Sequence, residues 1–312
     1  MIASLPAFLA SPTRPSPAHK NQNGVVMSCL KKSPFVSAST LAALAALSIA
    51  GGAAQAADWS DTYLGYRYGT QFAEPYNPAD ISKNIFSLTH ASGYKYGTNF
   101  LNVDVLLSDS KDPAKTSTSS GAQEIYVVYR HTLDIGKITG SPIAFGPVRG
   151  VGITGGFDVN TKNDAGYGSK KRMLVLGPTL MMDVPGFLNL SVLMLRESNQ
   201  PYFINERYTY KLHPMLSAAW GIPLPVSAVP TSFEGYANFI AAKGKDEVGN
   251  GTSPETNIDM QVMFDVGSLS GMGKNTFRLG VEYQYWKNKF GGAASIAGTK
   301  ASTPMIRLEY HF

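Results

Sequence analysis

Charged and amide side chains stand at every second position in several segments of this chain of 312 residues. In one segment Asn102 and Asp104 alternate with Leu101 and Val103, so that polar and apolar side chains fall on opposite faces of an extended strand. Such groups can form ion pairs and exchange hydrogen bonds with a solute. Because both signs of charge occur, the pattern favours a neutral polar solute over an ion of one sign. The polar members of these segments are Asn102, Asp104, Glu124, Arg130, Glu234, Asn238, Asp259, Gln261, Arg278, Glu282, Arg307 and Glu309.

Hydrolytic chemistry has weaker support in the sequence. His90 lies near Ser87 and Ser92, but no Gly-x-Ser-x-Gly motif is present, and a serine near a histidine is common by chance. The other histidines beyond residue 56 are His131, His213 and His311. The single cysteine, Cys29, and the lack of a ligand cluster give no support to a metal site. The sequence therefore predicts no enzyme and no cofactor, with a hydrolase as the less favoured alternative.

The composition excludes several classes of protein. Hydrophobic residues make up 44% of the chain and charged residues 16%, which is too little charge for a disordered chain. The formal net charge is +5, but four of the 27 Lys and Arg residues and none of the 22 Asp and Glu residues lie within 1–56. Beyond that point 23 basic residues face 22 acidic ones. A nearly neutral chain gives no basis for nucleic-acid binding.

Residues 1–56 have the pattern of a targeting sequence. Lys31 and Lys32 precede an apolar stretch at 38–50, and small residues follow up to Ala56. This order predicts a secretory signal peptide that is cleaved after Ala56, with Met27 as the true start of translation. An uncleaved anchor is the alternative, but the stretch is shorter than the roughly 18 residues that a spanning helix needs.

The remaining residues, 57–312, alternate over long segments. The strands of a soluble β-sandwich also alternate, so alternation alone does not distinguish a soluble protein from a membrane barrel. Segment length favours the membrane barrel, because many segments approach the roughly 9 to 11 residues of a strand that crosses a bilayer. Tyr and Phe also gather at segment ends, as in interfacial girdles. Twelve strands are predicted, at 62–68, 85–92, 98–108, 123–134, 147–159, 171–183, 187–196, 207–220, 231–242, 256–266, 276–286 and 303–312.

These features predict an all-β fold, a monomeric transmembrane antiparallel barrel in one domain at 57–312. An even number of strands places both termini on one side of the membrane, and the longer connections are expected on the other. Twelve strands are expected to leave a narrow lumen, because about eight fill with side chains and 16 to 18 leave a wide channel. Surface loops at 69–84, 110–122 and 287–302 keep open a second role as a receptor or adhesin, for example in phage attachment.

Several short motifs resemble the Tsx-like family of nucleoside-specific channel-forming outer-membrane proteins. They are Tyr68-x-Thr70-x-Phe72, Glu124-Ile125 followed by Arg130 and Leu133-Asp134, Phe145-Gly146-Pro147, and the terminal Tyr310-His311-Phe312. The resemblance extends over essentially all of 57–312. It implies a monomeric barrel of twelve strands in the bacterial outer membrane, through which nucleosides and deoxynucleosides diffuse passively. It also places Phe72 on a family phenylalanine associated with the nucleoside path.

The sequence and this resemblance together define the expected partners and pore lining. The partners are nucleoside-type small molecules, the lipid bilayer, and the outer-membrane barrel assembly machinery, which is expected to recognise the terminal Phe312. The residues expected to line the pore and contact the solute are Phe72, Tyr68, Asn102, Asp104, Glu124, Arg130, Arg278 and Glu282.

Overall fold

The computed structural model describes residues 57–204, 206–226 and 228–312. The expected signal peptide at 1–56 lies outside these residues. The described residues form twelve long antiparallel strands. Their bounds are β1 Trp59–Glu74, β2 Asn77–Tyr94, β3 Gly97–Ser108, β6 Gln123–Asp134, β7 Val148–Lys162, β8 Arg172–Met182, β9 Phe187–Asn199, β11 His213–Leu224, β12 Thr231–Ile240, β13 Glu255–Asp265, β14 Phe277–Lys287 and β15 Lys300–His311.

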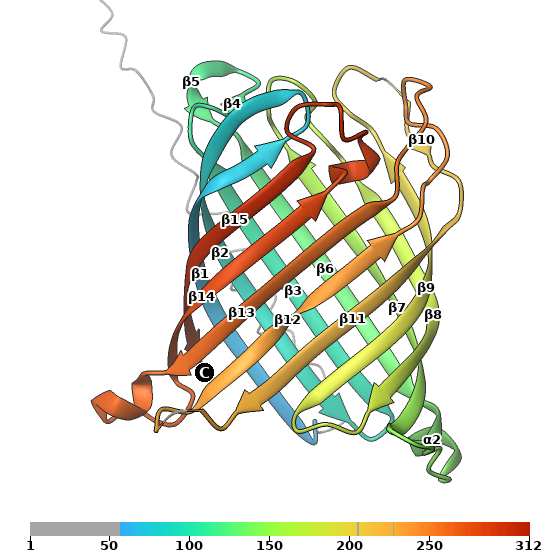
Figure 1. Ribbon diagram of the computed structural model, residues 1–312, viewed down its shortest axis with the longest axis vertical. Helices are drawn as coiled ribbons and strands as arrows, with labels where there is room; N and C mark the ends of the chain where they lie inside the picture. Colours follow the sequence, from blue (N-terminus) through green and yellow to red (C-terminus); the bar gives the residue numbers. More distant parts are fainter. Residues whose placement is uncertain (1–56, 205, 227) are drawn as a thin grey trace, which may run out of the picture. The chain divides into compact units, whose positions relative to one another are not determined.

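The strands close into a barrel (Figure 1). Each long strand pairs with the next one along the chain, and β15 pairs with β1 from Tyr63–His311 to Gly69–Met305. Closure leaves no long strand with a free edge, so backbone N–H and C=O groups are satisfied within the wall. The predicted twelve-stranded antiparallel barrel is therefore confirmed.

The two ends of the barrel differ in their connections. One end, the loop end, carries segments 109–122, 163–171, 200–204, 206–212, 241–254 and 288–299, and the short strands β4 (Pro113–Ala114), β5 (Ser117–Gly121) and β10 (Tyr208–Thr209) (Figure 1). The other, the termini end, carries Trp59, Phe312, α2 (Ile135–Thr139) and η1 (Gly267–Ser270). A third short helix, η2 (Lys289–Gly291), lies in the last loop of the loop end. No helix of the described residues is long and apolar enough to span a membrane.

The first hairpin departs from the sequence prediction. Residues 69–84 are not a long loop, because β1 continues to Glu74 and β2 begins at Asn77, with only Pro75 and Tyr76 between them. Pro is depleted in strands, so Pro75 and Pro78 suggested a loop. Pro75 instead occupies the turn, and Tyr76 supplies the positive φ, at 67°, that the tight reversal requires. An adhesive role that needs a long loop at 69–84 loses that support.

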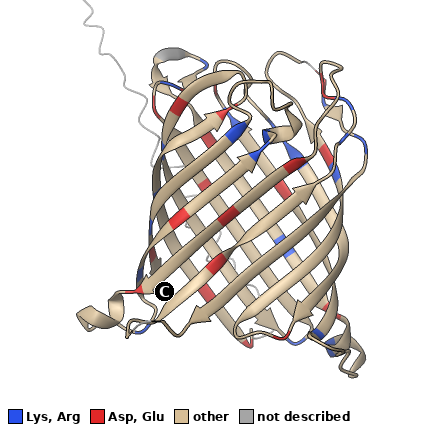
Figure 2. Ribbon diagram, in the orientation of Figure 1, with Lys and Arg blue, Asp and Glu red and all other residues tan. Residues whose placement is uncertain are grey.

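The outer face of the barrel is a belt of exposed apolar side chains. Leu176, with 61% of its surface exposed, belongs to this belt on β8, and its neighbours along the strand, Val175 and Gly177, are on the inward parity. Further members are Leu64, Phe86, Ile153, Leu174, Val192, Met194, Leu216, Phe239, Leu279, Val281 and Ile306. Many of the Lys, Arg, Asp and Glu residues of the strands are buried on the other face. Figure 2 shows where these residues lie along the ribbons. An apolar exterior around a charged interior is the arrangement of a barrel that crosses a lipid bilayer.

Candidate functional site: the inner face of the barrel

A continuous row of ion pairs follows the inner face across β3, β1, β14 and β15. The Arg67 guanidinium contacts Asp104 at 2.5 Å and Glu282 at 3.2 Å. Arg307 contacts the second oxygen of Glu282 at 2.7 Å and Glu309 also at 2.7 Å. Both glutamates are fully buried, so each carboxylate depends on these guanidinium groups for its hydrogen bonds.

Arg278 extends the row to β12 and β13. One of its nitrogens contacts Glu309 at 3.1 Å, and another pairs with Glu234 and donates a hydrogen bond of 2.5 Å to Ser232. Gln261 also donates to Glu234, at 3.1 Å. We call the chain of contacts from Asp104 to Glu234 the ionic ladder. It spans the seven neighbouring strands from β3 to β12 and presents both signs of charge to the interior.

A second polar group lies on β6 and β7. Arg130 contacts Asp158 at 2.5 Å, and the Tyr126 hydroxyl donates to the other oxygen of that carboxylate at 3.0 Å. On the same two strands, the Asn160 amide donates to Glu124 at 2.6 Å. Register explains the grouping, because Tyr126 pairs with Asn160 and Glu124 pairs with Lys162, which places all of them on one face.

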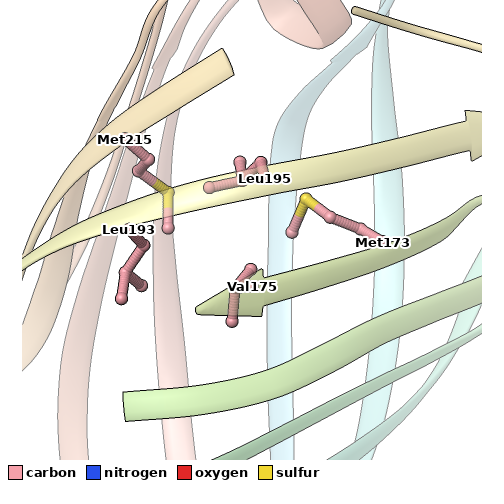
Figure 3. Close-up of a cluster of buried hydrophobic side chains, with 5 residues drawn as sticks. All are labelled: Met173, Val175, Leu193, Leu195 and Met215. Carbon is pink, nitrogen blue, oxygen red and sulfur yellow. The ribbon is translucent and has the colours of Figure 1, made fainter. Parts of the chain in front are cut away.

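An apolar patch covers part of the inner wall on the side of the ring opposite β15. It consists of Met173 and Val175 on β8, Leu193 and Leu195 on β9, and Met215 on β11 (Figure 3). All five are buried, with Ile240 packed against them. In strand order β8 lies half a ring away from β15. These side chains fill space on one side of the interior.

Six of the eight residues expected in the pore have inward side chains. Asn102, Asp104, Glu124, Arg130, Arg278 and Glu282 all share the inward parity of the strand pairs. The same parity holds for the other polar members of the sequence pattern, Glu234, Asn238, Asp259, Gln261, Arg307 and Glu309. Met263, which interrupts the alternation of its segment, is also inward and is completely buried.

Tyr68 is not in the interior. It shares the outward parity of Leu64 and Tyr66 and is 37% exposed, whereas Arg67 beside it belongs to the ladder. The expectation that Tyr68 lines the pore is therefore corrected. The reason is the pleat, because adjacent strand residues face opposite sides and the Tyr-rich segment was assigned without a register.

Phe72 is inside the barrel but is closed off from water. Only 4% of it is exposed, and it packs against Ile81, Ile85 and Met305 in a second buried cluster. The Lys83 ammonium lies 5.4 Å from the centre of its ring. In this conformation the Phe72 ring has no free face on which a solute base could stack.

Arg67 and Phe100 are among the inward residues that the sequence pattern does not reveal. Arg67 stands among the tyrosines of β1, and only its pairing with Ile85 and Arg307 shows that it faces inward. Phe100 also faces inward, since it pairs with Arg130 and lies two residues before Asn102. It is 40% exposed, which makes it an aromatic ring that is both inside the wall and open to water. In the sequence, only its spacing of two positions from Asn102 indicates that Phe100 faces inward.

In the described part of the chain, the hydrogen bonds of His90 and His131 go to groups other than serine. His90 accepts or donates a hydrogen bond of 2.7 Å with Thr62, and Ser87 and Ser92 are not its partners. His131 contacts Asn99 and the Tyr94 hydroxyl, both on the outward face. Within residues 57–312 as described, no group of three or more His, Cys, Asp or Glu side chains is placed to hold a metal ion.

Comparison with known proteins gives structural but not sequence relatives. No protein-family model matches the chain, and no curated protein matches it. The chain is similar to the solved structure of the KdgM porin, with 11% identity, coverage of 80% of this chain and 99% of that one, and a TM-score of 0.40. It is similar to the translocator domain of the autotransporter NalP from Neisseria meningitidis, with 13% identity, coverage of 88% and 95%, and a TM-score of 0.41. A third is OccK1 (OpdK) of Pseudomonas aeruginosa, with 8% identity, coverage of 81% and 98%, and a TM-score of 0.35.

Proposed function

We propose that this protein is a passive channel for small neutral polar solutes. The observation that carries the proposal is the ionic ladder, which lines the inside of a closed barrel with charges of both signs. Its more exposed members, Asp104 and Glu234, offer hydrogen bonds to a solute, and their arginine partners remove the net potential that would favour ions of one sign. A closed barrel of twelve strands has a narrow interior, as a selective pore for small molecules requires.

Nucleosides are the solute class that we propose, with deoxynucleosides included. The Tsx-like motifs of the sequence support this class, and Phe100 provides the chemistry. A base has two apolar faces and a polar edge, so it can stack on an exposed ring while its edge meets hydrogen-bond donors. Phe100 offers such a ring, and its cross-strand neighbour Arg130 offers the donors. The contact must be weak, because a tight site would hold the solute instead of releasing it.

The setting of this channel is also part of the proposal. We infer that the barrel acts as a monomer, since the ladder closes within one chain. The loop end then faces outward and the termini end faces the periplasm, as in bacterial barrels with short periplasmic turns. Phe312 is exposed at the end of β15, and we propose that it is the residue the barrel assembly machinery recognises.

The test is single-channel current through purified protein in a planar bilayer. Nucleosides should block the current reversibly at millimolar concentration, and sugars of similar size should block it much less. Phe100→Leu should raise the half-blocking concentration about fivefold or more, which corresponds to roughly 1 kcal/mol of lost stacking.

Phe157→Leu is the matched control, since Phe157 is a comparably exposed phenylalanine on the outward face. It should leave the block unchanged. Equal block by nucleosides and sugars would refute the nucleoside assignment and keep the channel. Absence of any current from folded protein would refute the channel itself.

A further inference from the structure

The end of β1 leaves the wall and enters the mouth of the barrel. Its pairing with β2 shifts register twice, between Gly69 and Phe72 and between Phe72 and Glu74. Residues Phe72, Ala73 and Glu74 are then buried in succession, whereas a strand in the wall buries every second residue. β-Bulges bend a strand in this way. The first hairpin therefore directs its tip over the lumen at the loop end.

One carboxylate oxygen at this tip forms ion pairs with three lysines. Glu74 Oε1 lies 2.6 Å from Lys83 Nζ on β2, 3.4 Å from Lys162 Nζ at the end of β7, and 3.2 Å from Lys289 Nζ in the loop before β15. All three lysine side chains are at least nine-tenths buried. In ring order β7 is four strands beyond β1 in one direction, and the β14–β15 loop lies in the other. Glu74 thus joins parts of the rim that no backbone ladder connects to it.

The lysines would be poorly compensated without Glu74. In the described part of the chain, Glu74 is the only carboxylate within ion-pair distance of Lys83 and of Lys289. Lys162 has two others, Asp112 at 2.9 Å and Asp164 at 3.7 Å. Burial lowers the pKa of Lys289, and its ammonium also donates to the Ala73 carbonyl oxygen at 2.7 Å. Buried ammonium groups in this number require an anion among them.

We propose that Lys83, Lys162 and Lys289 form a binding site for a soluble carboxylate, and that Glu74 occupies this site as an internal ligand. A carboxylated solute at the loop end competes with Glu74 for the three ammonium groups. When it replaces Glu74, the tip at 72–74 is released and the mouth widens. The site therefore senses anionic organic solutes, a class distinct from the neutral solutes that the ladder suits. The inference uses the barrel as its setting and does not depend on which solute crosses it.

The test measures how quickly the tip becomes accessible. Cys29→Ser removes the single cysteine of the chain, and Ala73→Cys then places one thiol on the tip. A bulky water-soluble maleimide should label this thiol slowly while Glu74 is paired with the three lysines. Addition of Glu74→Gln, which keeps the shape and removes the charge, should speed labelling about tenfold or more. Sodium propionate should speed labelling of the protein with Glu74 at least threefold over sodium chloride of equal ionic strength.

Two further arms decide the interpretation. In the Glu74→Gln protein propionate should give no additional increase, because the tip is already released. Glu247→Gln is the matched control, since this carboxylate at the same mouth accepts a hydrogen bond from Tyr210 at 2.6 Å. It should not change the labelling rate. If Glu74→Gln does not fold, Lys289→Gln, which removes one of the three ammonium groups, should speed labelling in the same direction.

The proposal is overturned if Glu74→Gln labels at the rate of the parent protein, or if propionate and chloride act equally. Labelling does not require current, so these outcomes are independent of the nucleoside test. If nucleosides block the channel but propionate does not change the labelling rate, the proposed function stands and this inference is wrong. If propionate speeds labelling but nucleosides do not block the current, this inference stands and the nucleoside assignment is wrong.

Discussion

The Arg307 guanidinium holds the carboxylates of Glu282 and Glu309 together, each at 2.7 Å. The two glutamates come from neighbouring strands, β14 and β15, and β15 closes the barrel against β1. Arg67 on β1 contacts the same Glu282, so that one carboxylate links the strands on both sides of the closure. The seam between the first and last strands is therefore secured by charge as well as by backbone hydrogen bonds.

Arg307→Met should destabilise the barrel by about 3 kcal/mol, because it leaves two buried carboxylates with fewer donors. The measurement is urea unfolding in lipid vesicles. The double variant Arg307→Met with Glu282→Met should lose less stability than the single variant, because it also removes one of the two buried carboxylates. Equal losses in the two proteins would show that the ladder is hydrated and carries no such cost.

Leu176→Arg should cost about 2–4 kcal/mol if Leu176 lies near the middle of the bilayer, because a guanidinium there loses its water. The same unfolding measurement in vesicles applies. Gln284→Arg is the inward control, since Gln284 faces the interior and donates to Asp259 at 3.1 Å. A larger loss for the inward variant would reverse the assignment of faces.

Gly177→Ala should destabilise the barrel by roughly 1–3 kcal/mol through a backbone clash. A Cβ at this position would lie 2.0 Å from the Val192 carbonyl oxygen, which belongs to the next strand and cannot move alone. Gly155→Ala is the matched control, since its Cβ would meet nothing closer than 3.6 Å. Thermal unfolding followed by gel mobility should separate the two variants, and similar midpoints would contradict the close packing of β8 and β9.

Glu247 should make stability depend on pH in the acid range. Burial raises the pKa of this loop carboxyl above its ordinary value of 4.5. At pH values between the ordinary pKa and the raised pKa, the folded protein binds more protons than the unfolded chain. The free energy of unfolding therefore falls as pH rises. The unfolding midpoint of the parent protein should therefore fall relative to that of Glu247→Gln as pH rises through this window. A difference that stays constant would place Glu247 in water.

Alternation was sufficient to predict the barrel, its number of strands and most of its inner face. The period of two assigns the direction of each side chain once a strand is located, which is why Asp104, Arg278 and Glu282 are inward as expected. It fails where register matters. Tyr68 and Phe72 differ by an even number of positions, yet the register shift between them sends the first outward and the second inward.

The tip of the first hairpin could not be derived from the sequence. Glu74 and Lys289 are separated by most of the chain, and nothing local to either residue indicates their contact. Pro75 and Pro78 favour a loop, but the structure places Pro75 in a tight turn and Pro78 at the start of β2. Long-range pairing between titratable groups needs the ring order of the strands, which only the closed barrel provides.

Pairing of β1 with β15 also fixes when the molecule can be completed. Residues 63–69 of β1 pair on one side with residues 305–311 of β15, so this side of β1 stays unpaired until the last strand is in place. Until then the nascent wall is an open sheet with two unsatisfied borders, the form most prone to associate with other chains. Assembly of this protein must therefore keep its opening strand protected until the final stretch of the polypeptide has been delivered.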